Sequence, residues 1–250
     1  GVFWPNDFSR DGYPYLQEMI EDDSEEIWDG LPPQAMAPPT PISPNPLGNT
    51  GPLEGLTVLE MTDEKGQWCG KLMADLGANV IKIEPPGGQS NRSIGPFYND
   101  IVDKEKSLHF WHYNTSKRSI TLDINTDEGK NIFLELARKA DIVLESLSLG
   151  YLDNLGIGYD RIKQSNPNVI MCSLTPFGQT GPWKDFKTSD LLHLAAGGQM
   201  ACCGYGDEYP DAPPIAPGGG QAWHTGSHFA CISILAALVY KTVTGVGQYL

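Results

Sequence analysis

The chain has 250 residues, of which 40% are hydrophobic and 19% are charged, and its formal net charge is −14 at pH 7. This hydrophobic content is sufficient for a folded core, so the composition excludes a wholly disordered chain. A protein that binds nucleic acid unaided needs a basic surface to neutralise phosphates, and the acidic balance disfavours that class.

Residues 1–52 differ in composition from the rest of the chain. Residues 1–50 hold nine carboxylates and a single basic residue, Arg10, and therefore contribute −8 of the net charge. Residues 31–52 are rich in proline, which fixes φ and donates no hydrogen bond, and this predicts an extended linker. Such an extension either lies on the surface or reaches a neighbouring subunit, and aromatic residues such as Trp4 favour the second interpretation. We therefore expect an acidic extension over 1–52 and a globular domain over 53–250.

The globular domain begins with a β-α-β pattern. Residues 56–61 predict a strand, residues 68–76 a helix that Gly77 closes, and residues 79–84 a second strand. Such a unit implies parallel strands joined by a right-handed crossover.

The alternation of strands and helices continues along the chain. Further strands are expected at 119–123, 142–144 and 169–174, and helices at 126–137, 150–155, 159–165, 190–198 and 226–240. Residues 244–250 read as a turn followed by the start of another strand, where we expect a missing part or another polypeptide to complete the core. The pattern predicts an α/β fold with an open, doubly wound parallel sheet.

Composition and cysteine usage indicate the compartment. No apolar run reaches the roughly 18 residues of a membrane span, and residues 229–240 are expected to form a buried helix. The N-terminal residues show no secretory signal. Five cysteines without CxxC spacing make a disulfide framework or a zinc site improbable, so we expect a cytoplasmic protein without a bound metal.

Conventional motifs are absent from the first strand-to-helix turn, where a ligand is expected in such a sheet. Residues 62–67 contain neither GxGxxG nor GxxxxGK[ST], and the chain has no GxSxG or HExxH motif. Residue patterns alone therefore indicate an α/β domain with an open crevice at the strand ends.

Longer stretches of sequence resemble the class III CoA-transferase (CaiB/BaiF) family. The stretches that carry the resemblance are 53–60, 76–88, 114–123, 140–146, 155–160, 166–173, 177–182, 234–238 and 244–248. The resemblance implies a Rossmann-like domain that binds coenzyme A thioesters, in a chain longer than this one with a second, smaller domain. It also implies an interlocked homodimer, or a second polypeptide that completes the fold, with acyl-CoA and a carboxylic acid as substrates.

The resemblance further implies a covalent mechanism. A family aspartate in a D-G-P-P or D-R-P-P context attacks the donor thioester, forming aspartyl-acyl and then aspartyl-CoA intermediates. The matching residue here is Asp211 in the sequence Asp-Ala-Pro-Pro, with Asp207 as a competing placement. Both could instead be solvated loop acids. Gly219 and Gly220 are expected to supply backbone N–H groups to the oxyanion.

CoA-binding residues are expected at two family turns and at nearby basic positions. The family's turn of small residues after the first strand corresponds to residues 65–68 here. Its E-N-F-x-P-G turn corresponds to residues 145–150, and a position beyond it that is often basic in the family is occupied by Asn154. Losing such basic groups predicts weakened or rearranged phosphate contacts. The candidates are Lys65, Gln67, Arg92, Lys117, Arg118, Ser146, Leu147 and Asn154. For Lys117 and Arg118 the alternative is a solvated start of a strand.

The residues of this chain also bear on other activities that the resemblance implies. A racemase needs two acid–base groups, and residues 220–224 contain no acid, which disfavours 2-methylacyl-CoA racemase activity. Asp190 is expected to orient backbone or a neighbouring helix, and His224 and His228 are expected to be structural rather than metal ligands. A CoA-transferase is the leading hypothesis, and a CoA-dependent lyase or a non-catalytic CoA-binding or assembly subunit are the alternatives.

Overall fold

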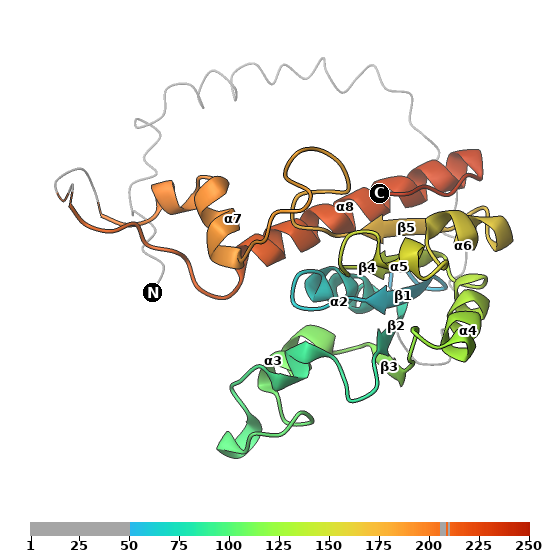
Figure 1. Cartoon of the computed structure of the whole chain (residues 1–250), viewed down its shortest axis with the longest axis horizontal. Coiled ribbons are helices and arrows are strands. Elements are labelled where there is room, and N and C mark those ends of the chain that lie inside the picture. The colour runs from blue at the N-terminus through green and yellow to red at the C-terminus, as the bar shows by residue number, and fades with distance from the viewer. Residues whose placement is uncertain (1–50, 206–208, 210) are drawn as a thin grey trace, which may run out of the picture. The chain divides into compact units, whose positions relative to one another are not determined.

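A computed structural model describes residues 51–205, 209 and 211–250 (Figure 1). The predicted extension over 1–52, apart from its last two residues, and the alternative nucleophile Asp207 lie outside the described residues. The strands are β1 (Thr57–Met61), β2 (Asn79–Glu84), β3 (Arg118–Thr121), β4 (Ile142–Glu145) and β5 (Ile170–Ser173). The helices are α2 (Gln67–Asp75), α3 (Leu108–Asn114), α4 (Asp127–Ala137), α5 (Tyr151–Asn154), α6 (Tyr159–Ser165), α7 (Asp190–Ala196) and α8 (Gln221–Thr244), with short 3₁₀ turns at Ser90–Ser93, Tyr98–Asp100 and Gln199–Cys202.

The five strands form one parallel sheet in the order β3-β2-β1-β4-β5, which confirms the predicted doubly wound fold. Successive residues of a strand point to opposite faces, so Val58 packs under α2 and α8 while Leu59 packs under α4 and α6. Helices therefore cover both faces of the sheet (Figure 1). Because β2 and β4 flank β1, the chain reverses direction across the sheet at β1 and β4, where such folds bind ligands.

Most element boundaries agree with the sequence-based expectations to within two residues. Gly77 has φ +99° directly after α2, the left-handed conformation that a terminating glycine permits. Helix α3 is absent from the sequence-based expectations; its N-cap Ser107 accepts a hydrogen bond from the Phe110 N–H. The last residues begin a further extended segment, as expected, and the structure places it along the edge strand β5, where the Leu250 N–H donates to the Met171 carbonyl at 2.8 Å.

The helix expected over 226–240 differs most from its prediction. It begins five residues earlier, after Gly220 (φ +71°), and ends at Gly245 (φ +73°). The expectation of a buried helix is wrong for its outer face, where Phe229 is 66% and Val243 81% exposed. By length and composition α8 could cross a membrane, a criterion that core helices of soluble proteins also meet. Small residues on its inner face pack on α2.

The two faces of α4 provide a test of the core. Phe133 is fully buried beneath the sheet, whereas its neighbour Ile132 is largely exposed. We expect Phe133→Ala to lower the free energy of unfolding by about 3–5 kcal/mol, because it removes buried surface and leaves a cavity. Ile132→Ala is the matched control, with an expected loss below about 1 kcal/mol. Urea denaturation measures both, and equal losses would contradict this placement of α4.

Candidate functional site

The carboxyl ends of β1, β4 and β5 open into a groove of about 890 Å³. We call it the switch-point groove, because it lies where the strand order reverses. Its walls come from the loop after β1, the loop after β4, the loop after β5 and the segment that leads into α7. They include Asp63, Glu64, Lys65, Ser146, Leu147, Ser148, Leu149, Thr175, Pro176, Lys184, Lys187, Asp190 and Trp223.

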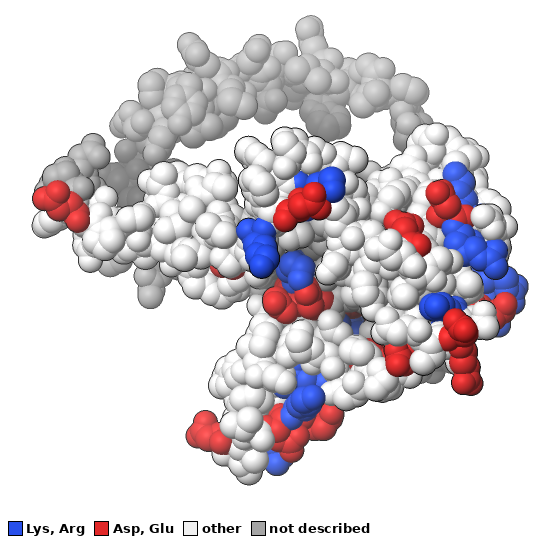
Figure 2. Space-filling model, viewed as in Figure 1, with Lys and Arg blue, Asp and Glu red and all other residues white. Residues whose placement is uncertain are grey.

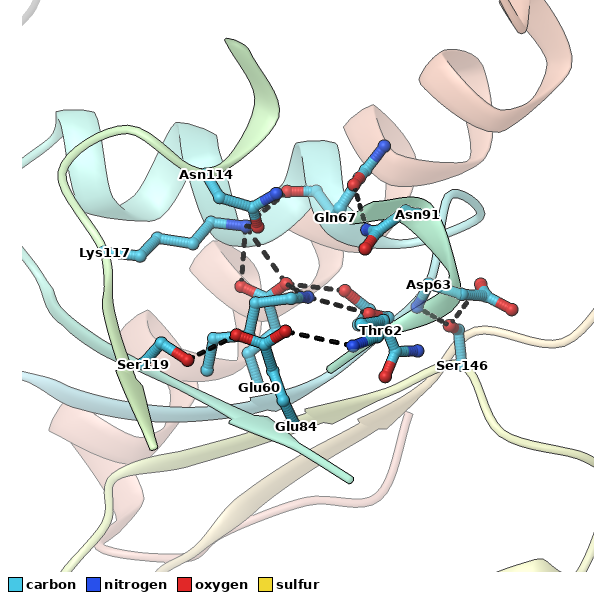
Figure 3. Close-up of polar contacts among 12 residues, drawn as sticks. Glu60, Thr62, Asp63, Gln67, Glu84, Asn91, Asn114, Lys117, Ser119 and Ser146 are labelled. Carbon is cyan, nitrogen blue, oxygen red and sulfur yellow. Dashed lines mark hydrogen bonds and ion pairs between the residues drawn. The ribbon is translucent and has the colours of Figure 1, made fainter. Parts of the chain in front are cut away.

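Two of these loops are joined by a hydrogen-bonded pair at the base of the groove (Figure 3). The Ser146 hydroxyl accepts from the Asp63 N–H at 3.0 Å and donates to Asp63 Oδ1 at 2.8 Å. The Lys65 ammonium pairs with the other oxygen of the Asp63 carboxylate. Ser146 and Lys65, both predicted to bind CoA, therefore lie at the groove with their side chains already engaged by Asp63.

Beneath the loop after β1 lies a buried ion cluster of Glu60, Lys82 and Lys117 (Figure 3). The Glu60 carboxylate is fully buried and pairs with Lys82 Nζ at 3.1 Å and Lys117 Nζ at 2.8 Å. Lys82 also donates to the Thr62 carbonyl, and Lys117 to the Gln67 carbonyl at the start of α2. The cluster therefore ties β1, β2, the approach to β3 and α2 together beside the groove.

Opposing effects determine the protonation states in this cluster. Burial alone would raise the pKa of Glu60, but the charges of Lys117 and Lys82 and hydrogen bonds from Lys117 and Thr62 outweigh it and lower that pKa. Burial lowers the pKa of Lys117 to about 8 against the attraction of Glu60. The Lys117 side chain is only 2% exposed, so the alternative of a solvated residue at the start of β3 is wrong for this lysine.

A second predicted basic residue, Arg92, is also bound to a carboxylate. Arg92 donates through Nε to Glu84 Oε2 at 2.6 Å and through Nη2 to Glu84 Oε1 at 2.8 Å, while its guanidinium lies 3.8 Å from the centre of the Phe110 ring. The Ser119 hydroxyl and the Gln89 N–H also donate to Glu84. Burial would raise the pKa of Glu84, yet these hydrogen bonds and the Arg92 charge lower it to about 2.

Gln67 lies at a second hollow of about 280 Å³, which we call the His109 cavity. Its side-chain carbonyl accepts from Asn91, and its amide nitrogen lies 3.0 Å from His109 Nε2. Burial lowers the pKa of His109, so the neutral ring accepts this bond at pH 7. The cavity is lined by Glu64, Gln67, Ile94, His109, Tyr113, Gly219, Gly220, Trp223 and His224.

The remaining predicted residues are spread over the surface. Arg118 and Asn154 are exposed at the start of β3 and the end of α5, and neither lines the groove or the His109 cavity. Asp211 is exposed in a turn before α8 and lines neither hollow. Gly219 and Gly220 do line the His109 cavity, with φ values of +85° and +71°. The structure thus brings Lys65, Ser146 and Leu147 together and leaves Asp211 apart from them.

Asp190 has the orienting role expected for it, and His224 and His228 are both engaged by neighbouring groups. Asp190 Oδ1 accepts from the Ala222 N–H at 2.9 Å, so it orients the first turn of α8. His224 Nε2 lies 2.6 Å from the Tyr113 hydroxyl. His228 donates through Nδ1 to the His224 carbonyl and accepts from Trp68 Nε1. Within the described part of the chain, no group of three or more metal-ligating side chains is present.

The sequence and the fold of the chain are both similar to those of known proteins. A family described as CoA-transferase family III matches residues 53–250. A formyl-CoA:oxalate CoA-transferase from Streptomyces avermitilis is 40% identical over 202 residues, which are 80% of this chain and 47% of that protein. The BbsE subunit of succinyl-CoA:(R)-benzylsuccinate CoA-transferase from Thauera aromatica is 34% identical over 191 residues, covering 76% of this chain and 46% of BbsE.

A crystal structure of a CaiB/BaiF family protein from Brucella suis has a TM-score of 0.75 and 38% identity to this chain. The match covers 81% of this chain and 53% of that one. The chain spans about half the length of the curated relatives it matches.

Gly70 provides a test of the buried ion cluster, because a Cβ at this position of α2 would lie 2.0 Å from Glu60 Oε2. We expect Gly70→Ala to lower the free energy of unfolding by about 1–3 kcal/mol through overpacking. The matched control is Gly226→Ala in α8, where the nearest atom lies 3.9 Å away. This substitution should leave stability unchanged or raise it by up to about 1 kcal/mol. Equal effects in thermal denaturation would contradict the described packing.

The depressed pKa of Glu84 predicts an acid dependence of stability. A carboxyl whose pKa is lower in the folded state stabilises the fold above its unfolded value, and this contribution is lost as the pH falls from about 4.5 to about 2. We expect Glu84→Gln to remove roughly 3 kcal/mol of stability at pH 7 and much less at pH 2. Glu128→Gln on the exposed face of α4 is the control. A wild-type and variant difference that is constant across pH would refute the assignment.

Proposed function

Because the chain belongs to CoA-transferase family III, we propose that it forms the CoA-binding part of an enzyme that moves CoA between carboxylic acids. The observation that carries the proposal is the switch-point groove, which lies where doubly wound folds bind ligands and has lysines on two walls. Formyl-CoA, oxalate and (R)-benzylsuccinate in the names of its relatives suggest small organic acids as the substrate class.

Coenzyme A carries phosphates, and basic residues lie among acidic ones on the face drawn in Figure 2. Lys184 and Lys187 lie in the segment before α7 and line the groove, although the Lys184 ammonium pairs with the Asp185 carboxylate at 2.8 Å on the surface. Exposed pairs of this kind are weak, so Lys184 can exchange Asp185 for a phosphate. We assign the phosphates to Lys184 and Lys187 rather than to Arg92 and Lys117, whose charges are committed to buried carboxylates.

The proposed chemistry follows the covalent route implied by the family. A carboxylate oxygen of Asp211 attacks the thioester carbonyl and expels the CoA thiolate, giving a mixed anhydride. The thiolate then attacks the aspartyl carbonyl and releases the donor acid, leaving an aspartyl-CoA thioester. The acceptor carboxylate attacks this thioester and expels the thiolate, giving a second mixed anhydride. The thiolate then attacks the acceptor carbonyl, which forms the new CoA thioester and releases the Asp211 carboxylate. Gly219 and Gly220 are proposed to stabilise the oxyanion through their N–H groups.

The position of Asp211 sets a condition on this mechanism. Asp211 is exposed and lines neither the groove nor the His109 cavity, so it must approach the groove in the reacting complex. The same position, together with the engaged Arg92 and Lys117, favours a non-catalytic CoA-binding subunit as the second candidate. BbsE, one of its relatives, is named as a subunit.

The surface of α8 supports the proposed association with another polypeptide. Phe229, Ile232, Val239, Tyr240 and Val243 form an exposed apolar face along this helix. Contiguous exposed apolar surface of this kind marks association sites. We propose that a second copy of the chain, interlocked with the first, or a complementing polypeptide covers this face. The five free thiols, all in described residues, support a cytoplasmic location.

Covalent trapping tests the nucleophile. Hydroxylamine should convert the aspartyl intermediate formed from an acyl-CoA into a hydroxamate on Asp211, detected by mass spectrometry of peptides. Asp211→Asn should abolish the label and lower turnover by several orders of magnitude, since a whole covalent step is lost.

Asp160→Asn, an exposed acid at the start of α6, is the control and should retain the label. A label on another residue, or unchanged turnover in Asp211→Asn, would overturn the assignment. Calorimetric titration with CoA separates the two candidate functions: binding without label or turnover supports the non-catalytic subunit.

A further inference from the structure

A third hollow, of about 290 Å³, lies beyond the carboxyl end of β5. It forms near the start of α8, against which α7 packs, and Figure 1 shows these two helices next to each other. We call this hollow the Thr175 cavity. It shares Lys65, Thr175, Pro176 and Trp223 with the switch-point groove, so the two hollows adjoin. Its walls are Lys65, Leu174, Thr175, Pro176, His193, Leu194, Gly197, Gln199, Ala222, Trp223, Thr225 and Gly226.

Two polar atoms in these walls are buried without a partner. Across the described ranges, neither Thr175 Oγ1 nor His193 Nε2 has a hydrogen-bond partner, although both atoms are inaccessible in the folded chain. Leaving a buried donor or acceptor unpaired is costly, and native proteins pair nearly all such groups. Both atoms belong to residues that line one cavity, so a single group bound there could pair with both once the Thr175 hydroxyl and the His193 ring turn to face it.

His193 is held in place and is neutral. Its ring centre lies 5.0 Å from that of Phe177 and 5.2 Å from that of Trp223, so two aromatic side chains fix the imidazole. Burial lowers the pKa of His193 against the opposing charge of Asp190, and the ring is therefore uncharged near pH 7. It offers one hydrogen bond to the cavity without a positive charge.

The cavity accordingly lacks an available counter-charge for an anion. Lys65 is the cation in its walls, and its ammonium already pairs with Asp63. The other walls are largely apolar, through Leu174, Leu194 and Trp223. Burying a second carboxylate here would remove it from water without a free cation, which is unfavourable. A hydroxyl or keto group can instead pair with both Thr175 and His193.

We propose that the Thr175 cavity binds the acyl group of the substrate, and that Thr175 and His193 select a chain with one uncharged hydroxyl or keto substituent over a dicarboxylate. The assignment rests on the proposed CoA transfer, because the adjoining groove is then the CoA site. Thr175 and His193 thereby become specificity-determining residues that the sequence motifs did not indicate.

Three acids of equal chain length test this selection: hexanoate, 6-hydroxyhexanoate and adipate. Calorimetric titration of the full chain should show 6-hydroxyhexanoate binding about 5-fold or more tightly than hexanoate, as expected for one or two added hydrogen bonds, with adipate weakest. Thr175→Val and His193→Phe should each lower the ratio of 6-hydroxyhexanoate to hexanoate affinity, and the double variant should bring it close to one. Melting temperatures establish that each variant folds.

The matched control is Thr225→Val. Thr225 lines the same cavity, but its hydroxyl already donates to the Gln221 carbonyl at 2.9 Å, so the affinity ratio should persist. Tightest binding by adipate, no binding of any acid, or an unchanged ratio in both the Thr175 and His193 variants would overturn the proposal.

Titration with CoA distinguishes a failure of the cavity assignment from a failure of the proposed function. A chain that binds CoA without the hydroxyl preference retains the function and loses the cavity assignment. A chain that shows the preference but does not bind CoA retains the selection by Thr175 and His193 but loses the proposed function, and with it the assignment of the cavity to the acyl group of a CoA thioester.

Discussion

The attraction between the buried Glu60 carboxylate and two lysines is the constraint on which the site depends. Desolvation opposes every charge in this cluster, and the charges persist because each is paired and hydrogen-bonded. Lys82 also holds the Thr62 carbonyl and Lys117 the Gln67 carbonyl, so the turn between β1 and α2 is fixed at both ends. Removal of Glu60 would leave two uncompensated lysine charges directly beneath the loop that carries Asp63 and Lys65.

The fold follows from the sequence to a large extent, because apolar runs and turn residues report local structure and a β-α-β repeat admits few topologies. The start of α8 was misplaced since three successive glycines conceal the N-cap at Gly220. Segment α3 was missed because its aromatic residues lack a clear helical period, although Ser107 offered a capping signal.

The candidate site was less accessible to sequence reasoning. Basic residues were expected to face a ligand, yet Arg92 and Lys117 face Glu84 and Glu60. The available signal was the presence of Glu60 and Lys82 inside otherwise apolar strands, a pattern that indicates buried pairs. Nothing local marked Thr175 and His193, because their juxtaposition arises only when α7 packs beside the carboxyl end of β5.

Trp223 lies in the walls of the switch-point groove, the His109 cavity and the Thr175 cavity. A change in the orientation of this indole alters the walls of all three hollows together. A ligand that moves the ring in one hollow therefore changes the affinity of the others, and thermodynamic linkage makes that effect equal in both directions. The first turn of α8 thus provides a physical route by which filling one hollow is communicated to its neighbours.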